Sequence, residues 1–233
     1  MTKFKEPFFR VKLSDQLIES MTLAALEAYV LGDQRNKKNK EKIETLGYIW
    51  GFRRIEGETV NLYLDRMSLS LSARRTNGSV TPHEHAAELK HNLIERWSPH
   101  LLLLGDFHTH PFDDLTEVKS NSGWDFSQAD LDYLDGDEFL WEKSDQTPVN
   151  LVMTVCRLGR VRETFSAEMC DQNLWQFDAG EFRFWLNVNV GFVNRDGDRR
   201  QTFKDKSGVF LDLNTRFYNM PGDRIASHIL RDA

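Results

Sequence analysis

The segment Val149–Cys156 constrains the fold most, because apolar residues occupy both of its alternating faces. A strand of this kind is buried on both sides, as in the middle of a sheet that other elements cover. The segment Leu101–Phe107 begins with four consecutive leucines and also reads as a buried strand. Two such strands predict an α/β architecture, in which helices lie on the faces of a sheet.

Three other segments have apolar residues at helical spacing. The first follows Ser14, whose hydroxyl suits an N-cap, and stops near Gly32. The second starts at Thr81-Pro82-His83-Glu84, with Thr as the cap and Pro at the first position. The third is Gln128–Leu140. For the second helix we expect a buried apolar stripe that consists of Ala86, Leu89, Leu93 and Trp97.

The remaining patterned segments alternate as strands do. Thr45–Arg53 is rich in large apolar residues, and Thr59–Ser72 alternates but changes phase, which predicts a bulge near Asp65–Arg66. Glu181–Phe192 has apolar residues at its even positions and mostly polar ones between them, which predicts a half-exposed antiparallel strand. Asp196-Gly197 then predicts a turn.

The order of these elements predicts the fold class. Helix, two strands, helix, strand, helix and strand follow one another over roughly residues 10–165, which favours an α-β-α sandwich around a mixed central sheet. We therefore predict one α/β domain over residues 1–170. Residues 171–233 form a β-rich C-terminal extension, packed on the same domain.

Bulk properties exclude several classes of function. The chain has 233 residues and a formal net charge of −6, which disfavours a nucleic-acid partner. Its main basic cluster, Arg35–Lys42, reads as a solvated loop. Two cysteines, Cys156 and Cys170, suit a reducing compartment better than a disulfide framework. The sequence shows neither a signal peptide nor a membrane-spanning run, so we expect a cytoplasmic protein without membrane association.

The segment Gly105–Pro111 (GDFHTHP) carries the clearest chemical signal. His108 and His110 project from the same face of a strand, so both imidazoles can bind one metal ion. We expect the strand to end at Pro111. A His-x-His pair alone also occurs in surface and packing positions, so the rest of the site has to come from other segments.

A second segment, Ser127-Gln128-Ala129-Asp130, reads first as a helix start with Ser127 as the cap. Asp130 on the first helical turn can also serve as a third metal ligand. Two histidines and one carboxylate leave a fourth tetrahedral position for water, as in catalytic zinc sites. Ser122–Asp125 has the same Ser-x-x-Asp spacing, but an apolar helical pattern follows only Asp130, which we prefer over Asp125.

Upstream, Glu44 stands at the mouth of a predicted strand, three residues before Gly47. Gly47 and Gly51 allow close approach of a neighbouring backbone. Taken alone, Glu44 reads as an ordinary exposed carboxylate.

Together these pieces resemble the JAMM, or MPN-type, metalloprotease family, which combines a Glu near the first strand, His-Ser/Thr-His-Pro and Ser-x-x-Asp. The resemblance covers the element order over more than half of the chain. One departure is the segment Phe112–Phe126, which separates Pro111 from Ser127 by more residues than the family usually has. This insertion is expected to lie beside the cleft and to affect substrate choice.

The resemblance implies a site and a reaction. His108, His110 and Asp130 would hold one Zn²⁺ per chain, Glu44 would act as general acid and base, and Ser127 would stabilise the oxyanion. The implied reaction is hydrolysis of an amide or isopeptide bond by a metal-activated water. The implied substrate is the C-terminal tail of a ubiquitin-like protein, or a peptide, bound by β-augmentation.

Two alternatives to the peptidase stay open: a non-catalytic MPN-type scaffold module, and a zinc hydrolase of a small-molecule amide. The substrate and the oligomeric state are open as well. Among the remaining candidates, His83, His85 and His91 read as solvent-facing, and Cys156 reads as a buried packing residue.

Overall fold

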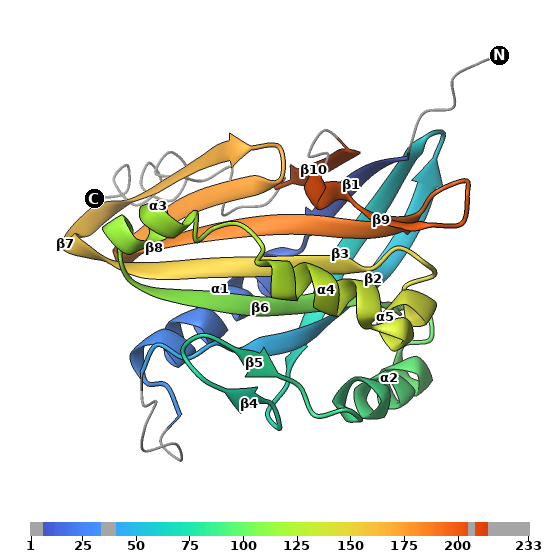
Figure 1. The fold of residues 1–233 in the computed structure, drawn as a ribbon, viewed down its shortest axis with the longest axis horizontal. Helices are drawn as coiled ribbons and strands as arrows, with labels where there is room; N and C mark the ends of the chain where they lie inside the picture. The colour runs from blue at the N-terminus through green and yellow to red at the C-terminus, as the bar shows by residue number, and fades with distance from the viewer. Residues whose placement is uncertain (1–6, 34–40, 205–207, 214–233) are drawn as a thin grey trace, which may run out of the picture.

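The computed structural model describes residues 7–33, 41–204 and 208–213. Within them a mixed eight-stranded sheet has the order β10-β1-β3-β2-β6-β7-β8-β9, and β4 pairs with β5 in a separate small hairpin (Figure 1). The strands are β1 (Phe8–Leu13), β2 (Leu46–Glu56), β3 (Thr59–Leu69), β4 (Arg74–Arg75), β5 (Val80–Thr81), β6 (Leu102–Asp114), β7 (Val149–Asp171), β8 (Leu174–Val193), β9 (Arg199–Gln201) and β10 (Val209–Asp212). The helices are α1 (Asp15–Val30), α2 (Ala86–Trp97), α3 (Leu115–Asn121), α4 (Gln128–Gly136), α5 (Glu138–Lys143) and the 3-10 turn η1 (Thr202–Lys204).

The two apolar strands lie inside the sheet, as predicted. β6 and β7 run parallel, and β8 pairs antiparallel with β7, so Val149–Cys156 has a neighbour on each side. Every residue from Val149 to Cys156 is buried. The coarse prediction of an α/β fold with a mixed sheet is therefore confirmed.

One face of the curled sheet encloses the main hydrophobic core with α1. Ser14 caps α1 as predicted, because its hydroxyl accepts a hydrogen bond from the Leu17 backbone N–H at 3.1 Å. The curl brings distant strands together, so that the rings of Phe9 on β1 and Phe192 on β8 lie 5.5 Å apart. The predicted bulge in β3 is present, since Trp50 pairs with Arg66 and Gly51 with Leu64, which leaves Asp65 unpaired.

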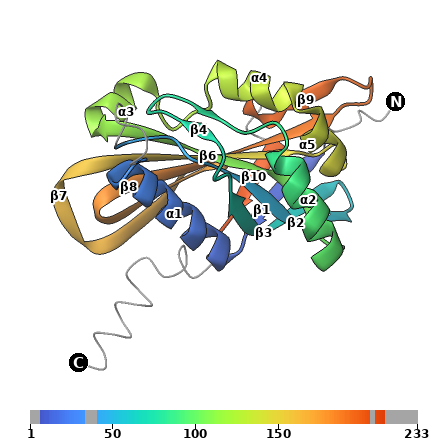
Figure 2. The ribbon, with the colours of Figure 1, turned by 90° about the horizontal axis from the view of Figure 1, so that it is seen from below.

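The opposite face of the sheet carries the smaller helices (Figure 2). Apolar residues of β2 and β6, among them Trp50 and Leu103, pack against Ala86 of α2, Leu134 of α4 and Leu140 of α5. Further along the strands, Cys156 and Trp185 pack against Val118 of α3. Helices thus lie on both faces of the sheet, and this second face also carries the two histidines of β6.

The second predicted helix differs from expectation in its start and in its orientation. α2 begins at Ala86, and Thr81 belongs to β5. Leu89 and Trp97 are 73% and 72% exposed, and Leu93 is exposed as well, whereas His91 is only 7% exposed. The prediction of a buried Leu89, Leu93 and Trp97 stripe is therefore wrong, and so is the prediction of a solvent-facing His91. The helix packs through Ala86 and His91 instead, with the His91 ring edge-on to Phe139.

Two other predicted elements also differ in their boundaries. β6 continues past Pro111 to Asp114, because beyond Thr109 it has β7 as its only partner among the described strands and an edge position tolerates proline. The predicted helix Gln128–Leu140 breaks at Asp137, whose carboxylate caps α5 by accepting a hydrogen bond from the Leu140 backbone N–H.

β8 is antiparallel, as predicted, but is not half-exposed. Its segment from Phe184 to Phe192 is buried throughout, including Asn187 and Asn189. These amides lie under the segment between α3 and α4 and under η1, where they find hydrogen-bond partners: Asn187 Nδ2 donates to the Trp124 carbonyl oxygen, and Asn189 Oδ1 accepts from the Phe203 N–H.

The strands after residue 170 pair within the same sheet. β8 follows β7 through a tight connection, β9 extends the sheet beyond β8, and β10 pairs with β1. The predicted turn at Asp196-Gly197 joins β8 to β9, with Gly197 at a φ of +87°. Residues 214–233 of the predicted extension and most of the basic cluster Arg35–Lys42 lie outside the described residues. None of the helices in the described part of the chain is long and apolar enough to cross a membrane.

Candidate metal centre

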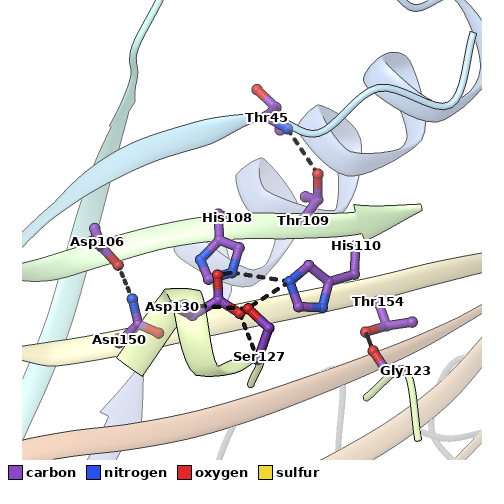
Figure 3. Close-up of polar contacts among 10 residues, drawn as sticks. All are labelled: Thr45, Asp106, His108, Thr109, His110, Gly123, Ser127, Asp130, Asn150 and Thr154. Carbon is purple, nitrogen blue, oxygen red and sulfur yellow. Dashed lines mark hydrogen bonds and ion pairs between the residues drawn. The ribbon is translucent and has the colours of Figure 1, made fainter. Parts of the chain in front are cut away.

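His108 and His110 lie on the same face of β6, beneath α4 (Figure 3). Their Nε2 atoms are 3.2 Å apart. The pairing of β6 with β7 fixes both positions, since His108 lies opposite Val152 and His110 opposite Thr154. The strand alternation predicted from the sequence therefore places both imidazoles in one site.

Asp130 completes the cluster from the first turn of α4. Its Oδ1 lies 3.2 Å from His108 Nε2, and its Oδ2 lies 3.4 Å from His110 Nε2. Ser127 positions this turn through a reciprocal capping box, in which its hydroxyl accepts from the Asp130 N–H at 3.2 Å and its own N–H donates to Asp130 Oδ2 at 2.7 Å. Asp125, the alternative with the same spacing, faces Asn187, whose Nδ2 is 3.4 Å from its Oδ1.

The geometry of the three side chains fits a tetrahedral metal ion. Their ligand atoms all lie within 4.8 Å of one another. Zinc–nitrogen and zinc–oxygen bonds of about 2.0–2.1 Å imply about 3.3 Å between adjacent ligand atoms of a tetrahedron. The 3.2 Å between the two Nε2 atoms matches that edge. Each Nε2 atom also lies at a similar distance from one oxygen of the Asp130 carboxylate, 3.2 Å from Oδ1 for His108 and 3.4 Å from Oδ2 for His110. Two imidazole nitrogens, a carboxylate oxygen and a free fourth position are the donor set of catalytic zinc.

The electrostatics of the cluster agree with a cation-binding role. Although burial alone would raise it, hydrogen bonds from His108 and His110 hold the pKa of Asp130 well below its usual range. Burial lowers the pKa of His108 in spite of the neighbouring carboxylate. Burial also acts to lower the pKa of His110, but Asp130 and Glu44 together raise it. A neutral imidazole and an ionised carboxylate are the forms that bind a metal.

Glu44 faces the same cavity from the start of β2. It is buried, and this burial, with the Asp130 carboxylate, raises its pKa to about 7 although His110 acts to lower it. Its backbone is held in place, because the Glu44 N–H donates to the Thr76 carbonyl at 2.7 Å and the next N–H, of Thr45, donates to Thr109 Oγ1 at 2.9 Å (Figure 3). A carboxyl group with a pKa near neutrality suits general acid–base work.

The glycines near Glu44 permit close packing of β2, as predicted. A Cβ atom on Gly51 would lie 1.9 Å from the Tyr63 carbonyl oxygen, and one on Gly47 would lie 2.8 Å from the Met67 side chain. Their role is thus to let β3 approach.

Ser127 lines the cavity beside Asp130. Its hydroxyl oxygen accepts the capping hydrogen bond, and the hydroxyl proton has no acceptor among the described residues. The hydroxyl can therefore donate to a group in the cavity.

The insertion Phe112–Phe126 forms one wall of the cavity. α3 occupies its middle, and the backbone that follows is tied to the sheet: Thr154 Oγ1 donates to the Gly123 carbonyl oxygen at 2.6 Å. The Gly123 backbone also acts to raise the pKa of His110. A Cβ atom at position 123 would lie 2.5 Å from the Phe112 ring, so any larger residue there would require this ring to shift. The insertion thus places a backbone group that acts on a metal-binding histidine, in a position fixed by Thr154.

The cavity has a volume of about 640 Å³ and lies between the β4–β5 hairpin and α4. Two lining residues were not predicted from the sequence, Asp106 and Asn150, which touch each other at the cavity floor (Figure 3). Burial, together with the carboxylate of Asp137, raises the pKa of Asp106 to about 8. Asp106 could have been predicted from strand alternation, because it lies two residues before His108 and therefore on the same face of the strand.

The cysteines do not enter the site. Cys156 is buried in the packing cluster beneath α3, as predicted, and burial raises the pKa of its thiol to about 12. Cys170 is exposed, and both thiols are free.

Comparisons with known proteins add little to this geometry. None of the protein-family models matches the sequence, and no curated protein matches it. Among solved structures, the chain is similar to the Trichoplax adhaerens STIL N-terminal domain, with 10% identity and a TM-score of 0.37. The similarity covers 78% of this chain but only 42% of that one. Neither a fold family nor a function follows from a similarity of this size.

Proposed function

We propose that this protein is a zinc-dependent hydrolase of amide or isopeptide bonds, with an α-β-α fold of the JAMM type. The observation that carries the proposal is the convergence of His108, His110 and Asp130, whose ligand atoms lie within 4.8 Å of one another, beside the buried Glu44. Sequence segments far apart in the chain supply these groups, and all four side chains line one cavity.

His108, His110 and Asp130 would hold the metal ion. A zinc ion bound there supplies an activated water, whose pKa falls to about 7, and a Lewis acid for the substrate carbonyl. The donor set favours zinc over magnesium or calcium, which prefer sites made of oxygen atoms alone.

Glu44 would move the proton. Its carboxyl group takes a proton from the attacking water and delivers it to the leaving amine, a role worth about 10²–10⁴-fold in rate. The pKa of about 7 in the metal-free site places the group where both protonation states are accessible near neutral pH. Ser127 would donate its unused hydroxyl proton to the oxyanion that develops on the substrate carbonyl.

The shape of the cavity supports an extended substrate, such as the C-terminal tail of a ubiquitin-like protein or a peptide. β4 and β5 pair only with each other among the described strands, and β5 contributes Val80 and Thr81 to the cavity wall. A substrate tail can add to this hairpin as a further strand by β-augmentation. The volume of about 640 Å³ is also in the range of small-molecule sites, so a small amide is the second candidate.

Replacement of the proton carrier tests the proposal and separates an enzyme from a scaffold. Glu44→Gln keeps the shape of the side chain but removes the base. We expect it to retain zinc and to lose at least about 100-fold in turnover of a Gly-Gly-linked ubiquitin-like conjugate.

The matched control is Glu56→Gln, which changes an exposed carboxylate of β2. This control should turn over like the wild type. Wild-type turnover by zinc-loaded Glu44→Gln would refute the assigned role, and zinc-loaded wild type without turnover of conjugates, peptides or small amides would favour the scaffold.

A further inference from the structure

Two polar side chains form the floor of the cavity beside the metal-binding cluster. Asp106 lies on the same face of β6 as His108, and Asn150 lies directly opposite it on β7. Asn150 Nδ2 donates a hydrogen bond to the Asp106 carboxylate (Figure 3). Asp106 is 1% exposed and Asn150 is 2% exposed, yet both line the cavity.

The hydrogen-bonding capacity of this pair is not filled. Asn150 Oδ1 is buried and has no hydrogen-bond partner among the described residues. The charged groups that act most strongly on Asp106 are the carboxylates of Asp137 and Asp130. No lysine or arginine in the described part of the chain forms an ion pair with it.

A buried carboxylate and amide without a cation destabilise the folded protein. Leaving a buried acceptor unsatisfied costs folding free energy, and an apolar pair of similar size would avoid that cost. Packing alone therefore does not account for the choice of Asp106 and Asn150. A ligand that brings hydrogen-bond donors and positive charge would account for the free amide oxygen of Asn150 and for the buried carboxylate of Asp106.

We propose that Asp106 and Asn150 form a subsite for a protonated amine of the substrate, close to the scissile bond. An ammonium group has three donors and no acceptor, so it can bind the Asp106 carboxylate and Asn150 Oδ1 together. This inference rests on the proposed function, because the metal cluster defines where the scissile carbonyl lies.

The position of the subsite sets the length of the ligand. Asp106 and His108 are two residues apart on one strand, so their Cα atoms are separated by roughly 6–7 Å. An amine that binds at the floor is therefore expected about three or four bonds from a carbonyl held at the metal cluster. The substrate class is an amide whose reacting part carries a primary amine at that distance.

Small hydroxamates test this length and charge directly, because a hydroxamate binds zinc and its tail can reach the floor. The zinc-loaded full chain is titrated calorimetrically with 3-aminopropanehydroxamic and 4-aminobutanehydroxamic acids. Butanehydroxamic and pentanehydroxamic acids are the controls, with a methyl group in place of each ammonium. We expect the wild type to bind at least one amine about tenfold more tightly than its matched control, as charge-assisted hydrogen bonds imply.

Variants assign the preference to the two residues. Asp106→Asn, which preserves shape, and Asn150→Leu should each reduce the amine preference to within twofold of unity while zinc content stays unchanged. The control Asn121→Leu alters a different cavity-lining residue, on α3, and should keep the preference. If Asn150→Leu does not fold, Asp106→Asn alone carries the assignment.

The outcomes separate the subsite from the proposed function. If acetohydroxamic acid binds the zinc-loaded wild type but neither amine exceeds its control, the subsite is refuted and the metal centre stands. An amine preference that survives Asp106→Asn also refutes it. A chain that takes up no zinc overturns the metal centre and the subsite together.

Discussion

Burial of Glu44 makes the stability of the metal-free protein depend on pH in a defined direction. Glu44 is 8% exposed, and its burial, with Asp130, raises the pKa of its carboxyl group from 4.5 to about 7. The folded state therefore binds this proton more tightly than the unfolded state does. Stability is undiminished below pH 4.5 and falls as the pH rises towards 7, because the unfolded chain releases the proton first.

The size of the effect follows from the shift. Each pKa unit corresponds to about 1.4 kcal/mol, so the buried carboxylate destabilises the metal-free protein by up to about 3 kcal/mol above pH 7. Glu44→Gln has no proton to lose and avoids this cost. We expect the variant to be more stable than the wild type at pH 8 by up to about 3 kcal/mol, with a difference that shrinks as the pH falls to 4.5.

Urea unfolding measures the difference. Wild type, Glu44→Gln and Glu56→Gln are stripped of metal with a chelator and unfolded at several values between pH 4.5 and pH 8. Glu56 is exposed and pairs with Arg54 at 3.0 Å on the surface, so its replacement should change stability by less than about 1 kcal/mol. A difference between Glu44→Gln and wild type that does not vary with pH would refute the buried environment of Glu44.

Two further pairs of variants test the geometry of the centre. Asp130→Ala should abolish zinc binding and Asp125→Ala should retain it, since Asp130 Oδ1 lies 3.2 Å from His108 Nε2. Elemental analysis measures the zinc content of both variants, and the reverse pattern would assign the ligand role to Asp125. Thr154→Val should weaken zinc binding about 10- to 100-fold in a chelator competition, because the Gly123 backbone, which acts on His110, loses the donor that holds it in place. Thr154→Ser restores the hydroxyl and should restore the affinity; unchanged affinity in Thr154→Val would show that this contact does not position His110.

Elements that depend on residues close together in the sequence were predicted correctly. The hydroxyl of Ser14 and the helical spacing after it gave α1, and the phase change in β3 gave the bulge at Asp65. Both features arise from neighbours in the sequence. The interior position of Val149–Cys156 was also predicted correctly, because apolar residues occupy both faces of this strand.

Predictions that depended on long-range packing were wrong. Leu89, Leu93 and Trp97 form an apolar stripe, but helical spacing does not reveal which side of α2 meets the sheet. In β8, alternation suggested that Asn187 lies in water, whereas the insertion before α4 covers it and accepts its hydrogen bond.

The candidate site shows the same division. His108, His110 and Asp130 stood out because a strand repeat and a helix start are local patterns. Asp106 and Asn150 did not, because their contact depends on the register between β6 and β7, which are far apart in the sequence. The sequence also contained no sign that the Gly123 backbone would act on His110.

The most direct test of the metal centre is the zinc content of the purified chain. Elemental analysis of protein dialysed against zinc and then against buffer should give about one zinc per wild-type chain, as three preformed ligands imply. The double variant His108→Ala/His110→Ala should contain almost none. The control His83→Ala/His85→Ala alters two exposed histidines and should keep the wild-type content. Wild type without zinc, or equal zinc in both double variants, would contradict the account.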